Sequence, residues 1–367
     1  MLGYIRAETG MGEAARSGAR ALQAAGLEFD IFNLDTGTGS SQSDLTWAQH
    51  EAARPGYGII LMHVNADSTV RVLLRLPRAF LRDKFVIVHW TWELPEFPDA
   101  WRSAFDHVDE VWVPSHFVQS AVAAKSPVPV IRIPYCVRVD QLAAVDRRRF
   151  NLPDKRFLFL TMFDQMSFSL RKNPDATLAA FARAFSGAKD GPGLVIKINR
   201  PQSVAMNDFC GQQIDALLAQ ARKVANVYVL DEVLNRADTN ALISLCDCFV
   251  SLHRAEGFGL VGAESMSLGK PVIQTGWSGN MDYMNWPGAA AVAYKLVPVG
   301  TDIGPYERHQ FWAEPDVDSA AEWMRRLAGD CELAHALGAA GRQVITDKFS
   351  PAVVGKLIAG RLAVITA

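Results

Sequence analysis

The sequence predicts an α/β protein built from two doubly wound domains, each a parallel sheet with helices on both faces. Its 367 residues exceed what one hydrophobic core usually serves, which favours two domains of comparable size. Short β-branched or aromatic runs alternate with helical segments along the chain, a pattern typical of covered parallel sheets. A polar stretch over residues 139–156 indicates the boundary between the domains.

The first predicted domain covers residues 1–150. Strands are expected at residues 3–6, 28–34, 57–64, 85–90, 110–114 and 130–133. Helices are expected at residues 12–25, 67–82 and 117–124. Pro77 should break the second helix, whose arginines share one face, either as a solvated surface or as a dock for an anionic acceptor or a membrane.

The second predicted domain covers residues 151–349 and repeats the alternation. Strands are expected at residues 157–162, 193–198, 227–230, 248–252 and 271–274. Helices are expected at residues 174–185, 209–224, 238–246 and 260–268, with two more starting at Ser319 and Leu333. The remaining residues, 350–367, contain an amphipathic helix that can pack back across the first domain.

Composition excludes several classes of function. The formal charge of -2 gives no global attraction to nucleic acid, so any binding of a polyanion must be local. No run approaches the ~18 consecutive apolar residues of a membrane-spanning helix. The N-terminus lacks the basic and then apolar pattern of a signal peptide. The expected location is therefore the cytoplasm, with peripheral contact at the inner face of the membrane left open.

Ligands of open parallel sheets bind beyond the carboxyl ends of the strands, and the loop at residues 251–260 is the most informative there. Its two glycines let backbone approach a ligand, and the helix that follows offers amides and a positive dipole end to phosphate. His253 and Arg254 add donors to this loop. Glu256 and Glu264 suit sugar hydroxyls, because a carboxylate would repel a diphosphate.

The pair Glu256 and Glu264 in this setting resembles the Glu-x7-Glu motif of retaining, nucleotide-sugar-dependent glycosyltransferases of the GT-B fold. The run Pro-Val-Ile-Gln-Thr-Gly-Trp-Ser-Gly-Asn-Met-Asp-Tyr at residues 271–283 is similar to enzymes of this group that build bacterial surface polysaccharides. The resemblance covers most of the chain and implies a GT-B enzyme with GDP-mannose as the best guess for the donor. It implies that Glu264 binds the ribose, although a solvated helix residue is the alternative. It also implies that the transferred sugar is held by Glu256 and by the amides of Phe258, Gly259 and Leu260.

A second loop, at residues 163–174, places a basic pair just before a helix that starts with proline. Lys172 matches a lysine of the resembled family, which implies that Lys172 and Arg254 neutralise the leaving diphosphate. Phe163-Asp164 stands where the family has Gly-Arg, so the usual arginine has no counterpart. The candidates to replace it are Arg171, Lys197 and Arg254.

A third loop opens the first long helix with Gly10-x-Gly12-x-x-Ala15. In a glycosyltransferase, a glycine loop that opens a helix can reach across the cleft, so Gly10 and Gly12 are candidates for the donor phosphates and Glu13 and Arg16 for the acceptor. The same pattern also matches a dinucleotide-binding fingerprint, so an NAD-dependent oxidoreductase is an alternative. Arg16 can equally be an ordinary surface residue.

A fourth loop follows the apolar strand that ends near residue 90. Trp92 and Glu93 suit a saccharide acceptor, because sugars pack on aromatic rings and their hydroxyls bind carboxylates. His89 is a candidate catalytic group, and His63 and Asn65 end another strand beside it. His89 can alternatively be a core histidine, and Trp92 a packing residue.

The sequence therefore predicts a retaining hexosyltransferase that uses a nucleoside diphosphate sugar and a saccharide or lipid-linked saccharide acceptor. No Asp-x-Asp metal motif is evident, so neither a metal nor a cofactor is expected. A GT-B epimerase and a non-catalytic sugar-binding protein remain alternatives.

Overall fold

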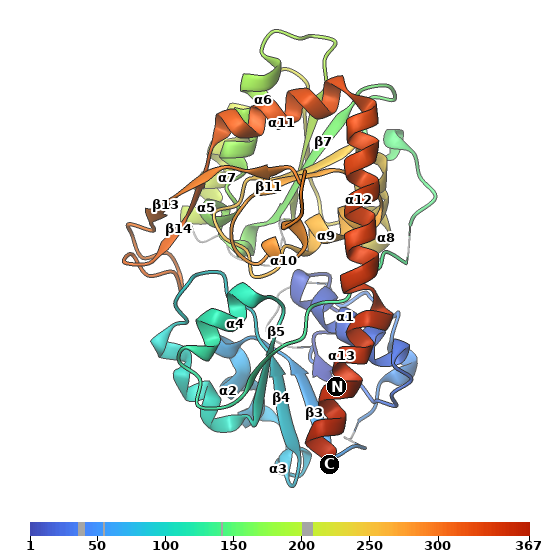
Figure 1. Ribbon diagram of the computed structural model, residues 1–367, viewed down its shortest axis with the longest axis vertical. Coiled ribbons are helices and arrows are strands. Elements are labelled where there is room, and N and C mark those ends of the chain that lie inside the picture. Colours follow the sequence, from blue (N-terminus) through green and yellow to red (C-terminus); the bar gives the residue numbers. More distant parts are fainter. Residues whose placement is uncertain (36–40, 54–55, 141, 200–207) are drawn as a thin grey trace.

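The computed structural model of the chain describes residues 1–35, 41–53, 56–140, 142–199 and 208–367. Two α/β units are stacked along the long axis, and the last two helices run down one side of both (Figure 1). The strands of the first sheet end at Arg132 and those of the second begin at Leu158. The boundary expected at residue 150 lies in the segment between the two sheets.

The first sheet has six parallel strands in the order β2-β1-β3-β4-β5-β6. Their bounds are β1 Leu2–Gly3, β2 Phe32–Asn33, β3 Ile59–His63, β4 Phe85–His89, β5 Glu110–Val113 and β6 Val130–Arg132. β2 is shorter than the strand expected at residues 28–34, because it lies at the sheet edge and pairs only with the two residues of β1. Strand order reverses between β1 and β3, which is where this fold class binds ligands.

The helices of the first unit follow the expected order. They are α1 Gly10–Ala24, η1 Ala48–His50, α2 Ala66–Arg75, α3 Arg78–Leu81, η2 Asp99–His107, α4 His116–Ala123 and η3 Arg147–Phe150. The break expected at Pro77 is confirmed, since α2 ends at Arg75 and α3 starts after the proline. Thr9 caps α1 and Ser115 caps α4, each by accepting a hydrogen bond from a backbone amide of the first turn.

The second sheet is also parallel and has the order β12-β11-β10-β7-β8-β9. Its strands are β7 Leu158–Asp164, β8 Gly193–Asn199, β9 Val227–Asp231, β10 Cys248–Ser251, β11 Val272–Thr275 and β12 Ala291–Val292. Apolar residues of β7, β8 and β10 are almost fully buried, as expected for strands covered on both faces. Strand order reverses between β7 and β10, so a second ligand-binding edge lies there.

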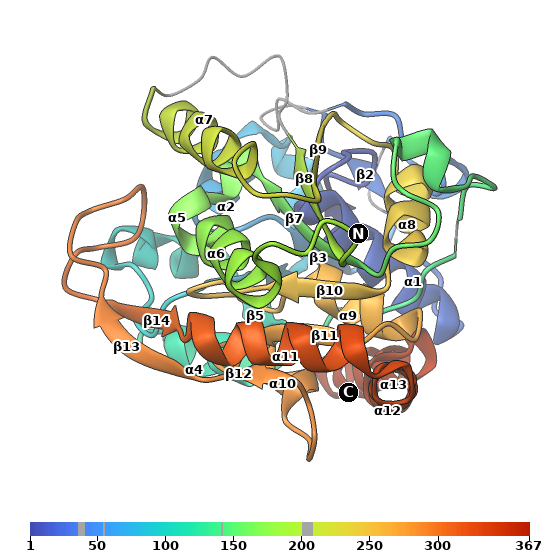
Figure 2. The ribbon, with the colours of Figure 1, turned by 90° about the horizontal axis from the view of Figure 1, so that it is seen from above.

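The second unit surrounds its sheet with helices on both faces (Figure 2). They are η4 Gln165–Ser167, α5 Ser169–Lys172, α6 Pro174–Phe185, α7 Asp208–Ala221, α8 Arg236–Leu245, α9 Leu260–Ser267, α10 Met281–Met284 and α11 Val317–Gly329. An antiparallel hairpin, formed by β13 Tyr294–Pro298 and β14 Phe311–Pro315, was not predicted from the sequence. The hairpin lies outside the two parallel sheets, and its Tyr294, Leu296 and Phe311 are exposed.

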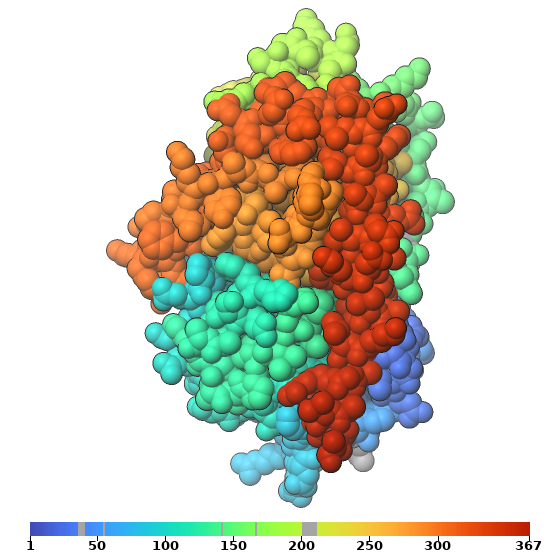
Figure 3. Space-filling view, in the orientation of Figure 1, coloured from blue at the N-terminus to red at the C-terminus, as the bar shows by residue number. Residues whose placement is uncertain are grey.

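The C-terminal helices α12 Cys331–Phe349 and α13 Pro351–Thr366 join the two units along one side (Figure 3). α12 packs on α9, and α13 packs on α1 of the first unit. Gly355 allows this approach, because a Cβ there would lie 2.6 Å from the Ala21 carbonyl oxygen. By length and composition Cys331–Thr366 could cross a membrane, although core helices of soluble proteins meet the same criterion.

Candidate active site

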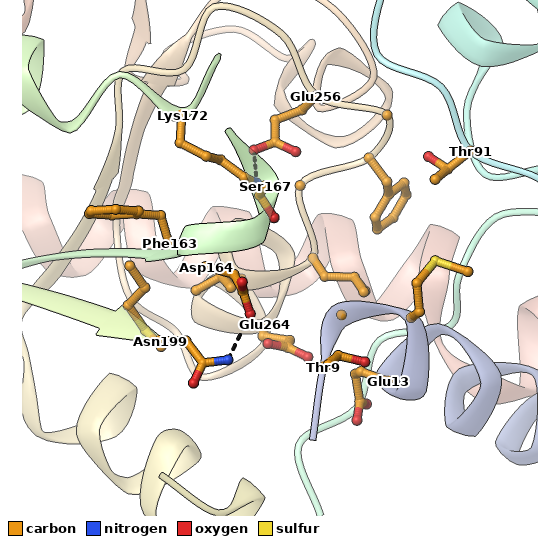
Figure 4. Close-up of a pocket in the computed structure, with 18 of the residues that line it drawn as sticks. Thr9, Glu13, Thr91, Phe163, Asp164, Ser167, Lys172, Asn199, Glu256 and Glu264 are labelled. Atoms are coloured by element: carbon orange, nitrogen blue, oxygen red, sulfur yellow. Dashed lines mark hydrogen bonds and ion pairs between the residues drawn. The ribbon is translucent and has the colours of Figure 1, made fainter. Parts of the chain in front are cut away.

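The carboxyl ends of both sheets face one cleft, with a volume of about 620 Å³, between the two units. Loops after β1 and β3 line it from the first unit, and loops after β7, β8 and β10 line it from the second (Figure 4). Both points at which strand order reverses therefore open into the same space. The predicted site residues that line the cleft are Gly10, Glu13, Arg16, Asn65, Glu93, Lys172, Lys197, Glu256, Phe258, Gly259, Leu260 and Glu264.

Lys172 and Arg171 hold the carboxylate of Glu256 at the end of the second sheet. Lys172 forms an ion pair with Glu256 Oε1 (Figure 4). Arg171 Nη1 lies 3.3 Å from Glu256 Oε2. Burial opposes ionisation of Glu256, but the two cations outweigh it and lower its pKa to about 2. The carboxylate therefore stays charged and keeps both cations at the cleft wall.

The loop of residues 255–260 approaches the first unit closely and then starts α9. A Cβ at Gly257 would lie 2.1 Å from Thr91 Oγ1, and one at Gly259 would lie 2.7 Å from the hydroxyl of Tyr283. Gly259 also has a φ of 83°, the left-handed region that glycine tolerates. The N-terminus of α9 thus lines a cleft that already holds lysine and arginine, which together suit an anion.

Glu264 lies in the cleft opposite Glu13, and Arg236 links them. Arg236 forms an ion pair with Glu264 Oε1, and its Nε lies 3.6 Å from Glu13 Oε2. Burial raises the pKa of Glu264, and Arg236 opposes that rise. Sequence reasoning missed Arg236, although its place just after β9 and at the first residue of α8 resembles that of the other loop residues it considered.

Glu13 and Arg16 reach the cleft, but each is engaged within the protein. Glu13 is paired with Arg16, Arg20 and Arg236, and these arginines outweigh burial and lower its pKa far below the ordinary range. Arg16 donates to the carbonyl oxygens of Ile5 and Ala7 at 2.9 and 3.0 Å. Only 3% of Arg16 is exposed, so the surface alternative is wrong.

Lys197 is another cation of the cleft, on β8 next to β7, whose last residue is Asp164. It is buried, and burial lowers its pKa to about 8 although Asp164 opposes the shift. Asp164 accepts a hydrogen bond of 2.7 Å from Asn199 (Figure 4). Arg171 is the other replacement that the structure brings into the cleft.

Asn65 and Glu93 line the first unit's side of the cleft. Asn65 Oδ1 accepts a hydrogen bond of 3.0 Å from the Thr91 amide. Glu93 accepts one of 3.2 Å from the hydroxyl of Tyr306 and lies 3.8 Å from Arg171. Gly10 faces open space, because a Cβ at that position would meet nothing within 4 Å.

The expectation that His89 and His63 face the cleft is wrong. His89 is buried between His63 and Tyr135, with ring centroids 5.1 and 4.9 Å away, and its Nε2 is 2.9 Å from the Ile133 carbonyl oxygen. Burial lowers the pKa of His89 to about 4. His63 stacks behind it, and Gly18 makes room for its ring. Both histidines belong to the core because their side chains point to the covered face of the sheet.

The predictions for Trp92 and Gly12 are also wrong. Trp92 is 1% exposed, packs edge-on against Trp101 and donates through Nε1 to the Glu96 carbonyl oxygen at 2.8 Å. Gly12 packs under its own loop, where a Cβ would lie 2.0 Å from the Ala7 carbonyl oxygen. Each is a packing position rather than a ligand contact.

His253 and Arg254 follow β10 but do not line the cleft. His253 is buried, and its ring nitrogens lie 3.2 Å from Ser251 Oγ and from Asn280 Oδ1. Arg254 pairs with Glu314 at 2.6 Å and lies over the ring of Trp312. Arg254 therefore anchors the β13–β14 hairpin. The prediction that it neutralises the leaving diphosphate is wrong, and Arg171 is the arginine that lines the cleft.

Residues 196–330, in the second unit, match the family described as Glycosyl transferases group 1. The whole chain is similar to a sucrose-phosphate synthase from Thermosynechococcus elongatus, with 16% identity, a TM-score of 0.67 and coverage of 98% of this chain and 94% of that one. The chain has the GT-B fold.

Other solved structures agree on this fold. HepE of Anabaena, in complex with UDP-glucose, is 16% identical with a TM-score of 0.61, covering 84% of this chain and 79% of that one. A UDP-forming trehalose-phosphate synthase from Burkholderia vietnamiensis is 13% identical with a TM-score of 0.57, covering 82% and 75%. A search of curated proteins finds no match. The fold and the matched segment together support a glycosyltransferase.

Among the described residues, no group of three or more His, Cys, Asp or Glu side chains could hold a metal ion. The cleft instead gathers lysine, arginine and helix-end amides around a space lined by carboxylates. Such a set can bind a diphosphate at one point and hydroxyl groups at others.

Proposed function

We propose that this chain is a retaining glycosyltransferase that moves a hexose from a nucleoside diphosphate sugar to a saccharide or lipid-linked saccharide acceptor. The observation that carries the proposal is the grouping of Lys172, Arg171 and the start of α9 where strand order reverses in the second sheet. A diphosphate fits this grouping, and Glu256 and Glu264 beside it can accept from hydroxyls of the transferred sugar and of the ribose.

Transfer forms a bond from an acceptor oxygen to the anomeric carbon and breaks the bond from that carbon to the diphosphate oxygen. Retention requires attack from the face that the diphosphate leaves, and the departing phosphate oxygen can take the acceptor proton. Negative charge grows on the diphosphate, so Lys172, Arg171 and the α9 amides lower the barrier because they are already in place. Glu256 stabilises the positive charge that develops on the sugar ring.

The donor is best sought among uridine nucleotides first. HepE was solved with UDP-glucose and the trehalose-phosphate synthase is UDP-forming, whereas GDP-mannose rests on sequence resemblance alone. A thermal-shift screen of UDP, GDP, ADP and their sugars tests this, because a ligand at ~100 times its dissociation constant stabilises by ~2.7 kcal/mol. If none of these compounds raises the melting temperature, the proposal fails.

Product analysis separates transfer from the alternatives. A retaining glycosyltransferase releases the nucleoside diphosphate and forms a new glycoside of unchanged anomeric configuration, which NMR detects. An epimerase would convert the donor without an acceptor, and a binding protein would leave it intact. The oxidoreductase alternative is disfavoured because Gly12 packs against Ala7 instead of facing a ligand. NAD should give no thermal shift.

We also propose that transfer needs no metal, since the cations that neutralise the diphosphate come from the chain. Activity should persist in excess chelator. A rate that depends on added Mg²⁺ or Mn²⁺ would contradict this.

A further inference from the structure

We infer that Arg236 is a positioning residue that fixes Glu264 for recognition of the donor's ribose and ties this recognition to α1 of the first unit. This inference rests on the proposed function, because it concerns the nucleotide end of the same donor. It adds a residue for which neither the motif nor the matched family description gives a role.

An arginine holds the carboxylate of Glu264 in the cleft. Among the described residues, Arg236 is the one that binds the Glu264 carboxylate, and it does so through Oε1. Both side chains are largely buried, with 19% of Arg236 and 4% of Glu264 exposed. A long carboxylate side chain in a wide cleft has several rotamers, and the arginine selects one of them. The second oxygen, Oε2, is then left to accept from a hydroxyl pair.

The positive charge of Arg236 lies between two carboxylates from different units. Glu264 is on α9 of the second unit and Glu13 is on α1 of the first, and both carboxylates line the cleft (Figure 4). Two buried carboxylates repel each other unless a cation lies between them. Arg236 supplies this cation, since it pairs with Glu264 and its Nε lies 3.6 Å from Glu13 Oε2.

The backbone of Arg236 and the side chain of Glu13 are themselves held in place. Arg236 is the first residue of α8, and Asn235 caps that helix by accepting from the Asp238 amide, so the arginine starts from a fixed backbone. Glu13 is itself held by Arg16 and Arg20. Glu264 is thus oriented by a chain of ion pairs that begins on the helix whose N-terminal residues line the opposite side of the cleft.

The test compares a nucleoside diphosphate with its 2′-deoxy counterpart, using whichever base binds best in the thermal-shift screen. Calorimetric dissociation constants give a ratio of deoxy to ribo affinity. Loss of a hydrogen bond to a charged group should make that ratio about tenfold or more in the wild-type protein. Arg236→Gln should reduce it to about threefold or less, and Arg236→Lys should keep an intermediate value.

A matched control is Arg325→Gln on α11, which removes an exposed arginine paired with Glu322 outside the cleft and should leave the ratio unchanged. Glu264→Gln should bring the ratio of deoxy to ribo dissociation constants close to one. Adding Arg236→Gln to that variant should not change the ratio further. A purely structural role for Arg236 would lower the melting temperature without moving the ratio. If Arg236→Gln is too unstable to measure, the ratio for Arg236→Lys is used: a ratio below the wild-type value supports the inference, and the wild-type value overturns it.

The possible failures are distinguishable. If the wild-type protein binds no nucleotide, the proposed function fails. If it binds nucleotide and both Arg236 variants keep the wild-type ratio, only the inference about Arg236 is overturned. A wild-type protein that binds ribo and deoxy nucleotides equally would also overturn this inference while the glycosyltransferase proposal stands.

Discussion

At the reversal of strand order in the second sheet, Lys172 and Glu256 face the cleft, whereas at the equivalent point of the first sheet His63 is buried in the core. Arg16 lines the first unit's side of the cleft, but backbone carbonyls and Glu13 take up its donors. The two units therefore share a topology and differ in what their loops leave for a ligand. The Arg16 side chain is 3% exposed, whereas the Lys172 side chain is 21% exposed, so Lys172, although paired with Glu256, is the cation that a diphosphate can reach.

The largest effect should come from Lys172→Met, which removes a cation at the point where the leaving diphosphate is expected. Transfer should fall by about 100-fold to 1,000-fold, the loss typical of one preorganised electrostatic contact. The rate under saturating donor and acceptor measures it. Arg325→Met is the control, because Arg325 on α11 is exposed and pairs with Glu322 outside the cleft. Equal losses in the two variants would show that the effect does not depend on a cation of the cleft.

Lys197 should give the next largest effect, as a dependence of donor affinity on pH. Its pKa is lowered to about 8 because burial disfavours the ammonium, so the cation is present at pH 7 and is lost as pH rises towards 9. Affinity for the donor should fall by up to about tenfold over that range. Lys197→Met should have the weaker affinity at both pH values and a flatter profile. An unchanged profile would remove Lys197 from the donor site.

The smallest effect on transfer should come from His89→Phe in the first unit. The phenylalanine cannot make the contact of His89 with the Ile133 carbonyl oxygen, but it keeps a ring between His63 and Tyr135. The free energy of unfolding should fall by about 1–3 kcal/mol, measured by denaturant titration. Turnover per folded molecule should stay within about threefold. A loss comparable to that of Lys172→Met would make the first unit catalytic as well.

Sequence patterns predicted the fold because buried strands such as β7 and β10 are mostly apolar runs that lead into polar loops. The rule that ligands bind beyond the strand ends pointed to the loops that carry Lys172 and Glu256, and the family resemblance added Glu264 on the helix that follows. It failed for His63, His89 and Trp92, because the end of a strand does not reveal whether a side chain turns to the cleft or to the covered face of the sheet. Of the two arginine candidates, only three-dimensional packing tells Arg171 from Arg254.

Arg236 could not be predicted for a different reason. Its role depends on two carboxylates that are far away in sequence, Glu13 and Glu264, and that meet only when the two units stack. The β13–β14 hairpin was missed because it is an antiparallel addition outside the two parallel sheets that the alternation of strands and helices predicts.

The most direct measurement is a crystal structure of the protein with the nucleoside diphosphate that binds best in the thermal-shift screen. The asymmetry between the units predicts phosphate oxygens within hydrogen-bond distance of Lys172 and the amides that open α9, with the ribose on Glu264. A nucleotide seated instead on the first unit's glycine loop, with its phosphates at Gly10 and away from Lys172, would contradict it.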